Sequence, residues 1–105
     1  LEKRKQYRKS VNLPGTYEHI RDGKFVERGG MKVMDLSGGG VKLKLNVERN
    51  FKEGEHLNIE FHLDDSKRTL IKKDVTIRNV SGLYIGTSFR SADVYDPVLG
   101  FYLMN

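Results

Sequence analysis

The sequence contains no cysteine, only two prolines and no long run of apolar residues. The lack of cysteine excludes disulfides, thiolate metal sites, redox pairs and a cysteine nucleophile. The scarcity of proline and the scattered glycines exclude a collagen-like or disordered chain. The longest apolar run, residues 98–104, contains Gly100 and is far shorter than the roughly 18 residues that a membrane span needs. With 105 residues, of which 37% are hydrophobic, we expect one small domain with a modest core.

The first residue is leucine rather than methionine, and no signal-peptide pattern follows it. We therefore expect a domain that belongs to a longer protein. The absence of cysteine fits a reducing compartment, which leads us to expect a cytoplasmic protein.

Positive charge is concentrated at the start of the chain. Residues 1–10 read LEKRKQYRKS and carry a net charge of +4, whereas the remaining 95 residues carry +1. A cationic arm on a nearly neutral body indicates an anionic partner at one place. The alternative is that the arm is simply a solvated, frayed terminus, because basic tails are common.

The body of the chain has the two-residue periodicity of half-buried β-strands. Four runs alternate apolar and polar residues clearly: 41–47, 57–63, 71–77 and 83–89. Residues 11–17 and 31–36 form weaker runs, and Pro14 places the first at an edge or a bulge. About six short strands with frequent turns predict an all-β barrel or sandwich.

Turn residues separate these runs. Residues 21–24, 28–30, 52–55, 64–67 and 79–82 are predicted turns or loops, since they are rich in glycine, aspartate and serine. Near the end of the chain, Asp96 and Pro97 predict a helix N-cap followed by proline at the first helical position. The short helix that follows would contain Val98, Phe101 and Tyr102.

Two arginines in the basic arm, Arg4 and Arg8, are four residues apart. An arginine guanidinium pairs with phosphate through two parallel hydrogen bonds, and it can also reach guanine O6 and N7. This pair therefore suits a compact ligand that carries both phosphate and guanine. The spacing alone is a weak signal, because it recurs by chance in basic segments.

A second group of candidate residues lies in the segment Asp35-Leu36-Ser37-Gly38-Gly39-Gly40, between two predicted strands. On a strand, Asp35 and Ser37 would point to the same face. A carboxylate can accept hydrogen bonds from the donors on a guanine edge, and glycines without Cβ allow a flat base to approach. The alternative is an ordinary β-turn. The segment matches neither a dinucleotide-binding nor a P-loop pattern.

Together, R-x-x-x-R at Arg4 and Arg8 and D-x-S-x-x-G at Asp35, Ser37 and Gly40 resemble the PilZ domain family. Residues 41–45, Gly54 and the run 85–89 are also similar to the family pattern, so the resemblance covers roughly residues 3–90.

The resemblance implies a six-stranded antiparallel β-barrel that binds the bacterial second messenger cyclic di-GMP without being an enzyme. It assigns ligand binding to Arg4, Arg8, Asp35, Ser37 and Gly40, with Lys3 as a further contact. Together with the basic arm and the helix signal described above, it leads us to expect a flexible arm at residues 1–10 and one barrel domain with a short C-terminal helix at residues 11–105. Ligand binding would order the arm and present an altered surface to an effector protein or neighbouring domain. The ligand stoichiometry stays open.

Other readings of the sequence are weaker. A β-barrel that binds single-stranded nucleic acid would need exposed aromatic residues on one strand, but Phe61 and Phe89 are on the buried phase. A ligand-free interaction module of the same fold would be expected to have damaged motifs, and both motifs are intact. We expect no metal, because His56 and His62 would lie about 20 Å apart on one strand. Ser37 lacks the G-x-S-x-G context of a hydrolase nucleophile.

Overall fold

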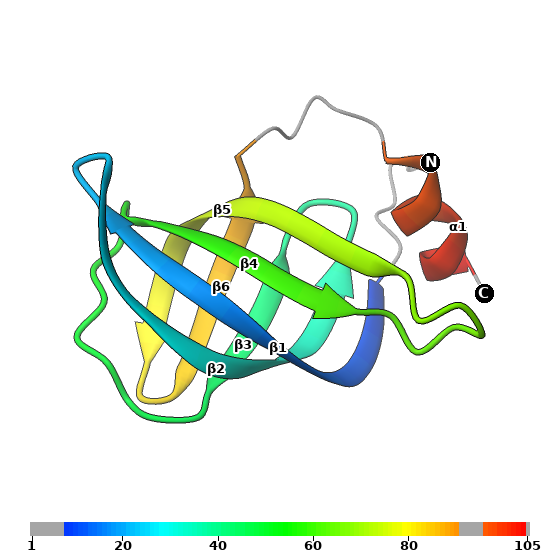
Figure 1. Ribbon diagram of the computed structural model, residues 1–105, viewed down its shortest axis with the longest axis horizontal. Coiled ribbons are helices and arrows are strands. Elements are labelled where there is room, and N and C mark those ends of the chain that lie inside the picture. The colour runs from blue at the N-terminus through cyan, green and yellow to red at the C-terminus, as the bar shows by residue number, and fades with distance from the viewer. Residues whose placement is uncertain (1–7, 91–95, 105) are drawn as a thin grey trace, which may run out of the picture.

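The computed structural model describes residues 8–90 and 96–104. Six antiparallel strands close into a barrel in the order β1-β2-β3-β6-β5-β4, with one helix at the C-terminal end (Figure 1). This confirms the predicted barrel with a short helix. The elements are β1 (Arg8–Arg21), β2 (Lys24–Ser37), β3 (Val41–Leu45), β4 (His56–His62), β5 (Leu70–Ser81), β6 (Tyr84–Phe89) and α1 (Pro97–Met104).

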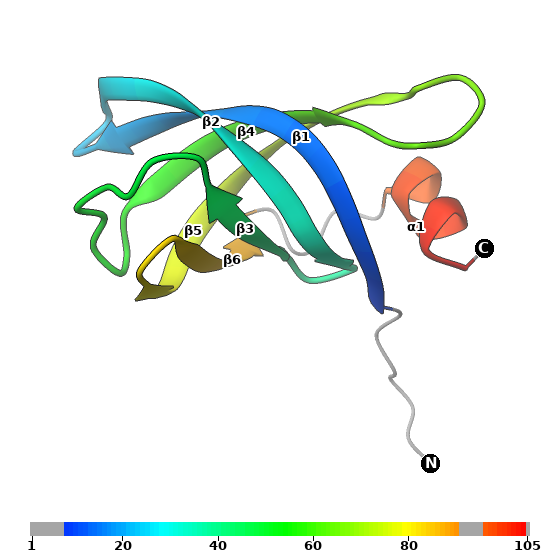
Figure 2. The same cartoon turned by 90° about the horizontal axis from the view of Figure 1, so that it is seen from below.

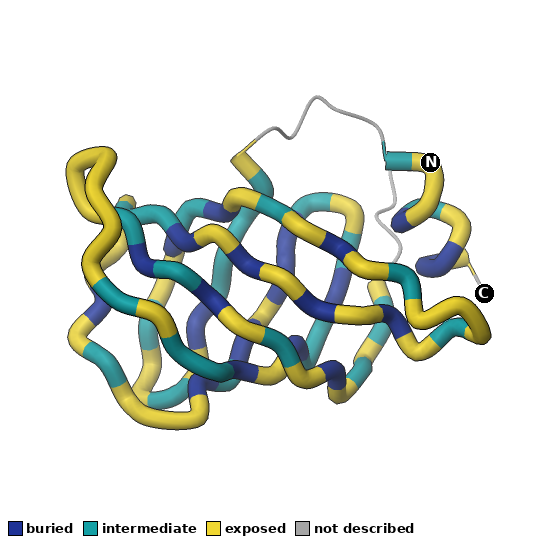
Figure 3. The backbone as a smooth tube through the Cα atoms, viewed as in Figure 1, coloured by how far each residue is buried: buried dark blue, intermediate teal, exposed yellow. Residues whose placement is uncertain are grey.

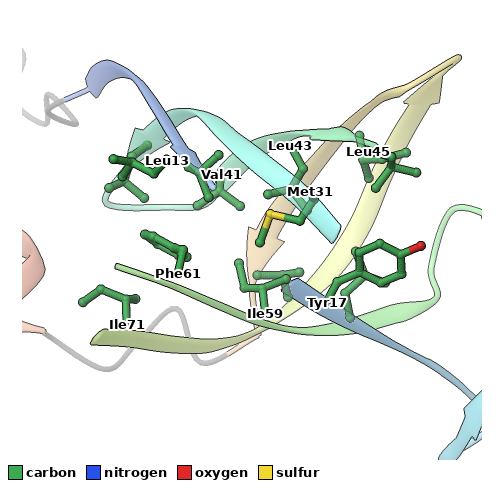
Figure 4. Packing of buried hydrophobic residues seen from close by; sticks show 14 of the residues in the cluster. Leu13, Tyr17, Met31, Val41, Leu43, Leu45, Ile59, Phe61 and Ile71 are labelled. Carbon is green, nitrogen blue, oxygen red and sulfur yellow. The ribbon is translucent and has the colours of Figure 1, made fainter. Parts of the chain in front are cut away.

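The apolar residues of the alternating runs fill the inside of the barrel. Buried and exposed residues alternate along the strands in Figure 3, and Figure 4 shows the inward side chains packed together. Burial of these side chains is the main favourable contribution to folding. Val47 was expected to point inward with the other apolar residues of its run, but it lies beyond the end of β3 and is exposed. The main buried positions on the four clear runs are Val41, Leu43, Leu45, Leu57, Ile59, Phe61, Ile71, Val75, Ile77 and Ile85.

The predicted loop at residues 28–30 is wrong, because these residues lie inside β2. Gly29 pairs with Tyr17 of β1, and a Cβ atom at Gly29 would be only 2.5 Å from the Tyr17 hydroxyl. The glycine therefore leaves room for a buried tyrosine ring rather than forming a turn. The predicted turn at 79–82 is also shorter than expected, since β5 continues to Ser81.

Register shifts in three strand pairs change which residues point inward. The β1–β2 pair has two, one between Ser10 and Leu13, next to Pro14 as the proline predicted, and one between His19 and Ile20. The others lie between Val33 and Asp35 in β2 and between Ile77 and Asn79 in β5. A β-bulge of this kind inserts one residue, bends the strand and re-aims nearby side chains.

Helix α1 begins as the sequence predicted, with Asp96 accepting a hydrogen bond from the backbone N–H of Leu99 at 3.1 Å. Its Tyr102 hydroxyl donates to Asp64 at 2.6 Å, and the Lys9 ammonium lies 4.0 Å from the centre of the Tyr102 ring. These contacts hold α1 beside the start of β1 (Figure 2). Within the described residues, no helix has the length and apolarity to cross a membrane.

A polar cluster occupies the end of the barrel near the β1–β2 hairpin, away from α1 (Figure 1). His19 is buried there, and its Nε2 is 2.9 Å from a carboxylate oxygen of Glu55. Glu55 also accepts hydrogen bonds from the side chain of Arg21 and from the backbone N–H of Lys52. Burial by itself raises the pKa of Glu55, but these hydrogen bonds outweigh it and lower the pKa to about 2.

Because the native state lowers the pKa of Glu55 from 4.5 to about 2, its ionised form stabilises the fold above pH 4.5. This stabilisation is lost as the pH falls towards 2. We expect Glu55→Gln to lower the free energy of unfolding by about 1–3 kcal/mol at pH 7, and the difference from the parent to shrink below pH 4.5. Urea unfolding at a series of pH values measures this, with exposed Glu53→Gln as the control. A difference that stays constant down to pH 2 would contradict the prediction.

Candidate functional site

A cavity of about 400 Å³ opens where β2 turns into β3, a volume typical of small-molecule sites. Five of the six strands contribute to it, because β1, β2, β3, β6 and β5 are consecutive neighbours in the barrel. Its walls combine charged side chains with glycines and short polar residues. The lining residues are Arg8, Asp35, Ser37, Gly39, Gly40, Val41, Lys42, Arg78, Asn79, Gly86 and Thr87.

Four of the residues predicted from the two motifs, Arg8, Asp35, Ser37 and Gly40, line this one cavity. The antiparallel register explains why they meet, since Arg8 of β1 lies opposite Ser37 of β2. The other predicted residues, Arg4 and Lys3, lie outside the described part of the chain. Arg8, Lys9 and Ser10, which the sequence analysis assigned to the arm, are the first residues of β1.

Arg8 and Asp35 form an ion pair across the mouth of the cavity, with Arg8 Nη1 3.4 Å from Asp35 Oδ2. The Arg8 side chain is 70% exposed, so water screens the pair and it contributes little to stability. The other Asp35 oxygen, Oδ1, is buried and has no hydrogen-bond partner among the described residues. A buried acceptor without a donor is unfavourable, so Asp35 is prepared to accept a hydrogen bond from a ligand.

The Ser37 hydroxyl builds the turn that shapes the cavity. It accepts hydrogen bonds from the backbone N–H groups of Gly39 and Gly40 and donates to the Gly40 carbonyl, each at 3.2 Å. The Ser37 backbone N–H also donates to the Gly40 carbonyl, at 3.0 Å. Ser37 thus fixes the conformation of the glycine segment as well as facing the cavity.

Gly40 allows β3 to approach β6 closely. A Cβ atom at Gly40 would overlap the carbonyl oxygen of Thr87 and lie 2.8 Å from the Cα of Ser88. The same contact is secured by the Thr87 hydroxyl, which donates to the Val41 carbonyl at 2.9 Å. Gly40 therefore has a packing role in closing the barrel beside the cavity.

Sequence reasoning missed Lys42, Arg78, Asn79 and Thr87. The signal for two of them was present, because Arg78 and Asn79 are consecutive polar residues that interrupt the apolar alternation of β5. Such an interruption marks a bulge, and bulges concentrate near binding sites. With Arg8, Lys42 and Arg78 against Asp35, the cavity has an excess of positive charge and suits an anion.

In residues 8–90 and 96–104, no three or more histidine, aspartate or glutamate side chains are grouped to hold an ion. His56 and His62 occupy the two ends of β4, and His19 belongs to the polar cluster at the hairpin end. The cavity instead presents hydrogen-bond donors and a carboxylate, which are suited to reversible binding.

The PilZ domain family model matches residues 2–97 of the chain. The chain belongs to the PilZ domain family. This family consists of non-enzymatic receptors, which agrees with the expectation of a bacterial signalling domain without catalytic activity. No curated protein matches the chain in sequence.

Two solved structures share the fold of this PilZ domain. The inhibitor of motility MotI/DgrA from Bacillus subtilis matches with a TM-score of 0.76 and 16% identity over 99% of this chain. The PilZ domain of YcgR from Escherichia coli, solved with cyclic di-GMP, matches with a TM-score of 0.68 and 16% identity over 98% of this chain. The chain covers 87% of the YcgR domain but only 51% of the motility inhibitor.

Adding a methyl group at Gly40 tests its packing role. We expect Gly40→Ala to lower the free energy of unfolding by about 1–3 kcal/mol, because β3 must move away from the β6 backbone. Gly38→Ala is a matched control in the same motif, since a Cβ there would have no neighbour within 4 Å. Urea unfolding of both variants measures the difference, and equal stability of the two would show that the contact is unimportant.

Proposed function

We propose that this PilZ domain binds cyclic di-GMP in the cavity lined by β1, β2, β3, β6 and β5 and acts as a signalling receptor. The observation that carries the proposal is the convergence of Arg8, Asp35, Ser37 and Gly40 on one positively charged cavity. The same fold in the PilZ domain of YcgR, solved with cyclic di-GMP, adds support. Asp35 Oδ1, which has no hydrogen-bond donor among the described residues, is a physical reason to expect a ligand with N–H donors.

Each motif residue has a role in this proposal. Arg8 exchanges its exposed ion pair with Asp35 for a phosphate of the ligand, and Arg4 joins it from the preceding segment. Asp35, released from Arg8, accepts hydrogen bonds from the N1 and N2 donors of a guanine. Ser37 and Gly40 hold the turn against which the base lies.

The proposed signal is the ordering of the part of the basic arm that precedes β1, residues 1–7, against the barrel, since residues 8–10 of the predicted arm already belong to β1. Charge-assisted hydrogen bonds contribute about 1.5–3 kcal/mol each, and four or five of them must offset the entropy cost of ordering the arm. The resulting free energy of ligand binding is about −8 kcal/mol, which corresponds to micromolar affinity. The ordered arm, with Lys3 as a further contact, then changes the surface that an effector protein or neighbouring domain meets.

Removing the Arg8 guanidinium tests the site directly. We expect Arg8→Ala to weaken cyclic di-GMP binding at least about tenfold in titration calorimetry, because charge-assisted hydrogen bonds to phosphate are lost. Lys24→Ala is the matched control, since it removes one positive charge at the β1–β2 hairpin, far from the cavity (Figure 1). Unchanged binding by Arg8→Ala, or equal loss in the control, would contradict the assignment.

The same titration separates the competing functions. A receptor for cyclic di-GMP binds the dinucleotide and ignores a single-stranded oligonucleotide at equal concentration. Preferential binding of the oligonucleotide would instead support a nucleic-acid role, although Phe61 lies inside the barrel. If the parent binds neither, the domain is a ligand-free interaction module and the proposed function is wrong.

A further inference from the structure

The cavity has a second basic wall that neither sequence motif contains. Arg78 and Asn79 of β5 line the cavity, and along the five strands that contribute to it β5 is the last and β1, with Arg8, is the first. Their orientation on β5 and their contacts with neighbouring residues indicate how they could bind a ligand.

The β5 bulge is the reason that Asn79 points outward together with Arg78. Val75 and Ile77 are buried, and simple alternation would turn Asn79 inward. The register shift lies between Ile77, which pairs with Thr87, and Asn79, which pairs with Gly86. Arg78 is the residue left without a partner on β6, and both Arg78 and Asn79 are exposed.

Arg78 is held in place without being neutralised. Its Nε donates to the hydroxyl of Ser88 at 2.7 Å, which leaves the two terminal nitrogens of the guanidinium for another acceptor. Among the described residues no carboxylate pairs with Arg78, whereas Arg21, Arg28 and Arg49 each pair with a glutamate. An arginine fixed by a neutral hydroxyl keeps its full charge and its planar fork.

The neighbouring residues add an amide and a further positive charge to this side of the cavity. At Gly86, a Cβ atom would lie 2.7 Å from the Asn79 amide, so the glycine lets the amide lie flat against β6. Lys42 of β3 pairs with Gly86 and adds a further positive charge to the cavity. This side of the cavity therefore presents the preorganised guanidinium and amide of β5 and the lysine of β3, with no carboxylate from β5 or β6 lining the cavity.

We infer that Arg78 is a second phosphate-binding residue, which takes one phosphate of the ligand while Arg8 takes the other. This inference rests on the proposed function and adds a requirement to it: the ligand has two phosphates, each facing a different wall of the cavity. Arg78 is prepared for binding before the ligand arrives, whereas Arg8 must first leave Asp35. Ser88 is a positioning residue, because it acts on the ligand only by orienting Arg78.

Titration calorimetry with cyclic di-GMP tests the inference. We expect Arg78→Ala to weaken binding about 10- to 100-fold, because a charge-assisted pair with phosphate is lost. Arg78→Lys should recover part of the affinity, since lysine keeps the charge but not the fork. Ser88→Ala should weaken binding less than Arg78→Ala, and in the Arg78→Ala background it should have no further effect. Lys24→Ala serves as the control for loss of one charge.

Two results would overturn the inference while leaving the proposed function intact. One is parent-like binding by Arg78→Ala, with Arg8→Ala still impaired. The other is loss of affinity in Arg78→Ala accompanied by a lower unfolding midpoint than that of Lys24→Ala, which would show a structural role.

A second measurement decides the role of Arg78 even if the parent does not bind cyclic di-GMP. Inorganic phosphate is titrated into ¹⁵N-labelled protein, and the side-chain Nε–H resonances of the arginines are followed. We expect the Arg78 signal to shift more than that of Arg28, which is paired with Glu18. Failure of the dinucleotide to bind refutes the proposed function, whereas an Arg78 signal that moves no more than the Arg28 signal refutes the anion site.

Discussion

The close contact between β3 and β6 is the constraint on which the site depends. β3 has only five residues, and it must join β2 to β6 for the barrel to close. Gly40 makes this possible by letting the chain pass against the backbone at Thr87, and the Ser37 hydroxyl fixes the turn that leads into it. The cavity lies at this junction, so the residues that close the barrel also shape the binding surface.

Two bulges place polar and charged side chains at the cavity. In β2, the register shift precedes Asp35, and in β5 it contains Arg78. Without the shifts, simple alternation would point Asp35 and Asn79 inward. After each shift the inward position falls on an apolar residue instead, Leu36 in β2 and the partly buried Val80 in β5. The regular alternation of the strands builds the core, and its interruptions place the charged groups.

Much of this architecture could be predicted from the sequence, because inward and outward residues alternate clearly in β3, β4 and the first part of β5. The helix cap at Asp96 and the convergence of Arg8 with Asp35 also follow local patterns or a known family pattern. Gly29 was misread as part of a loop, because glycine marks turns and close packing equally well. Arg78 was missed, because two consecutive polar residues indicate a bulge but do not show which other strands lie beside it in the barrel.

The first residues of β1 contact two different parts of the molecule. Arg8 reaches Asp35 at the cavity, whereas the next residue, Lys9, covers the ring of Tyr102 in α1. Because the two side chains share adjacent backbone, a displacement of this strand end disturbs both contacts together.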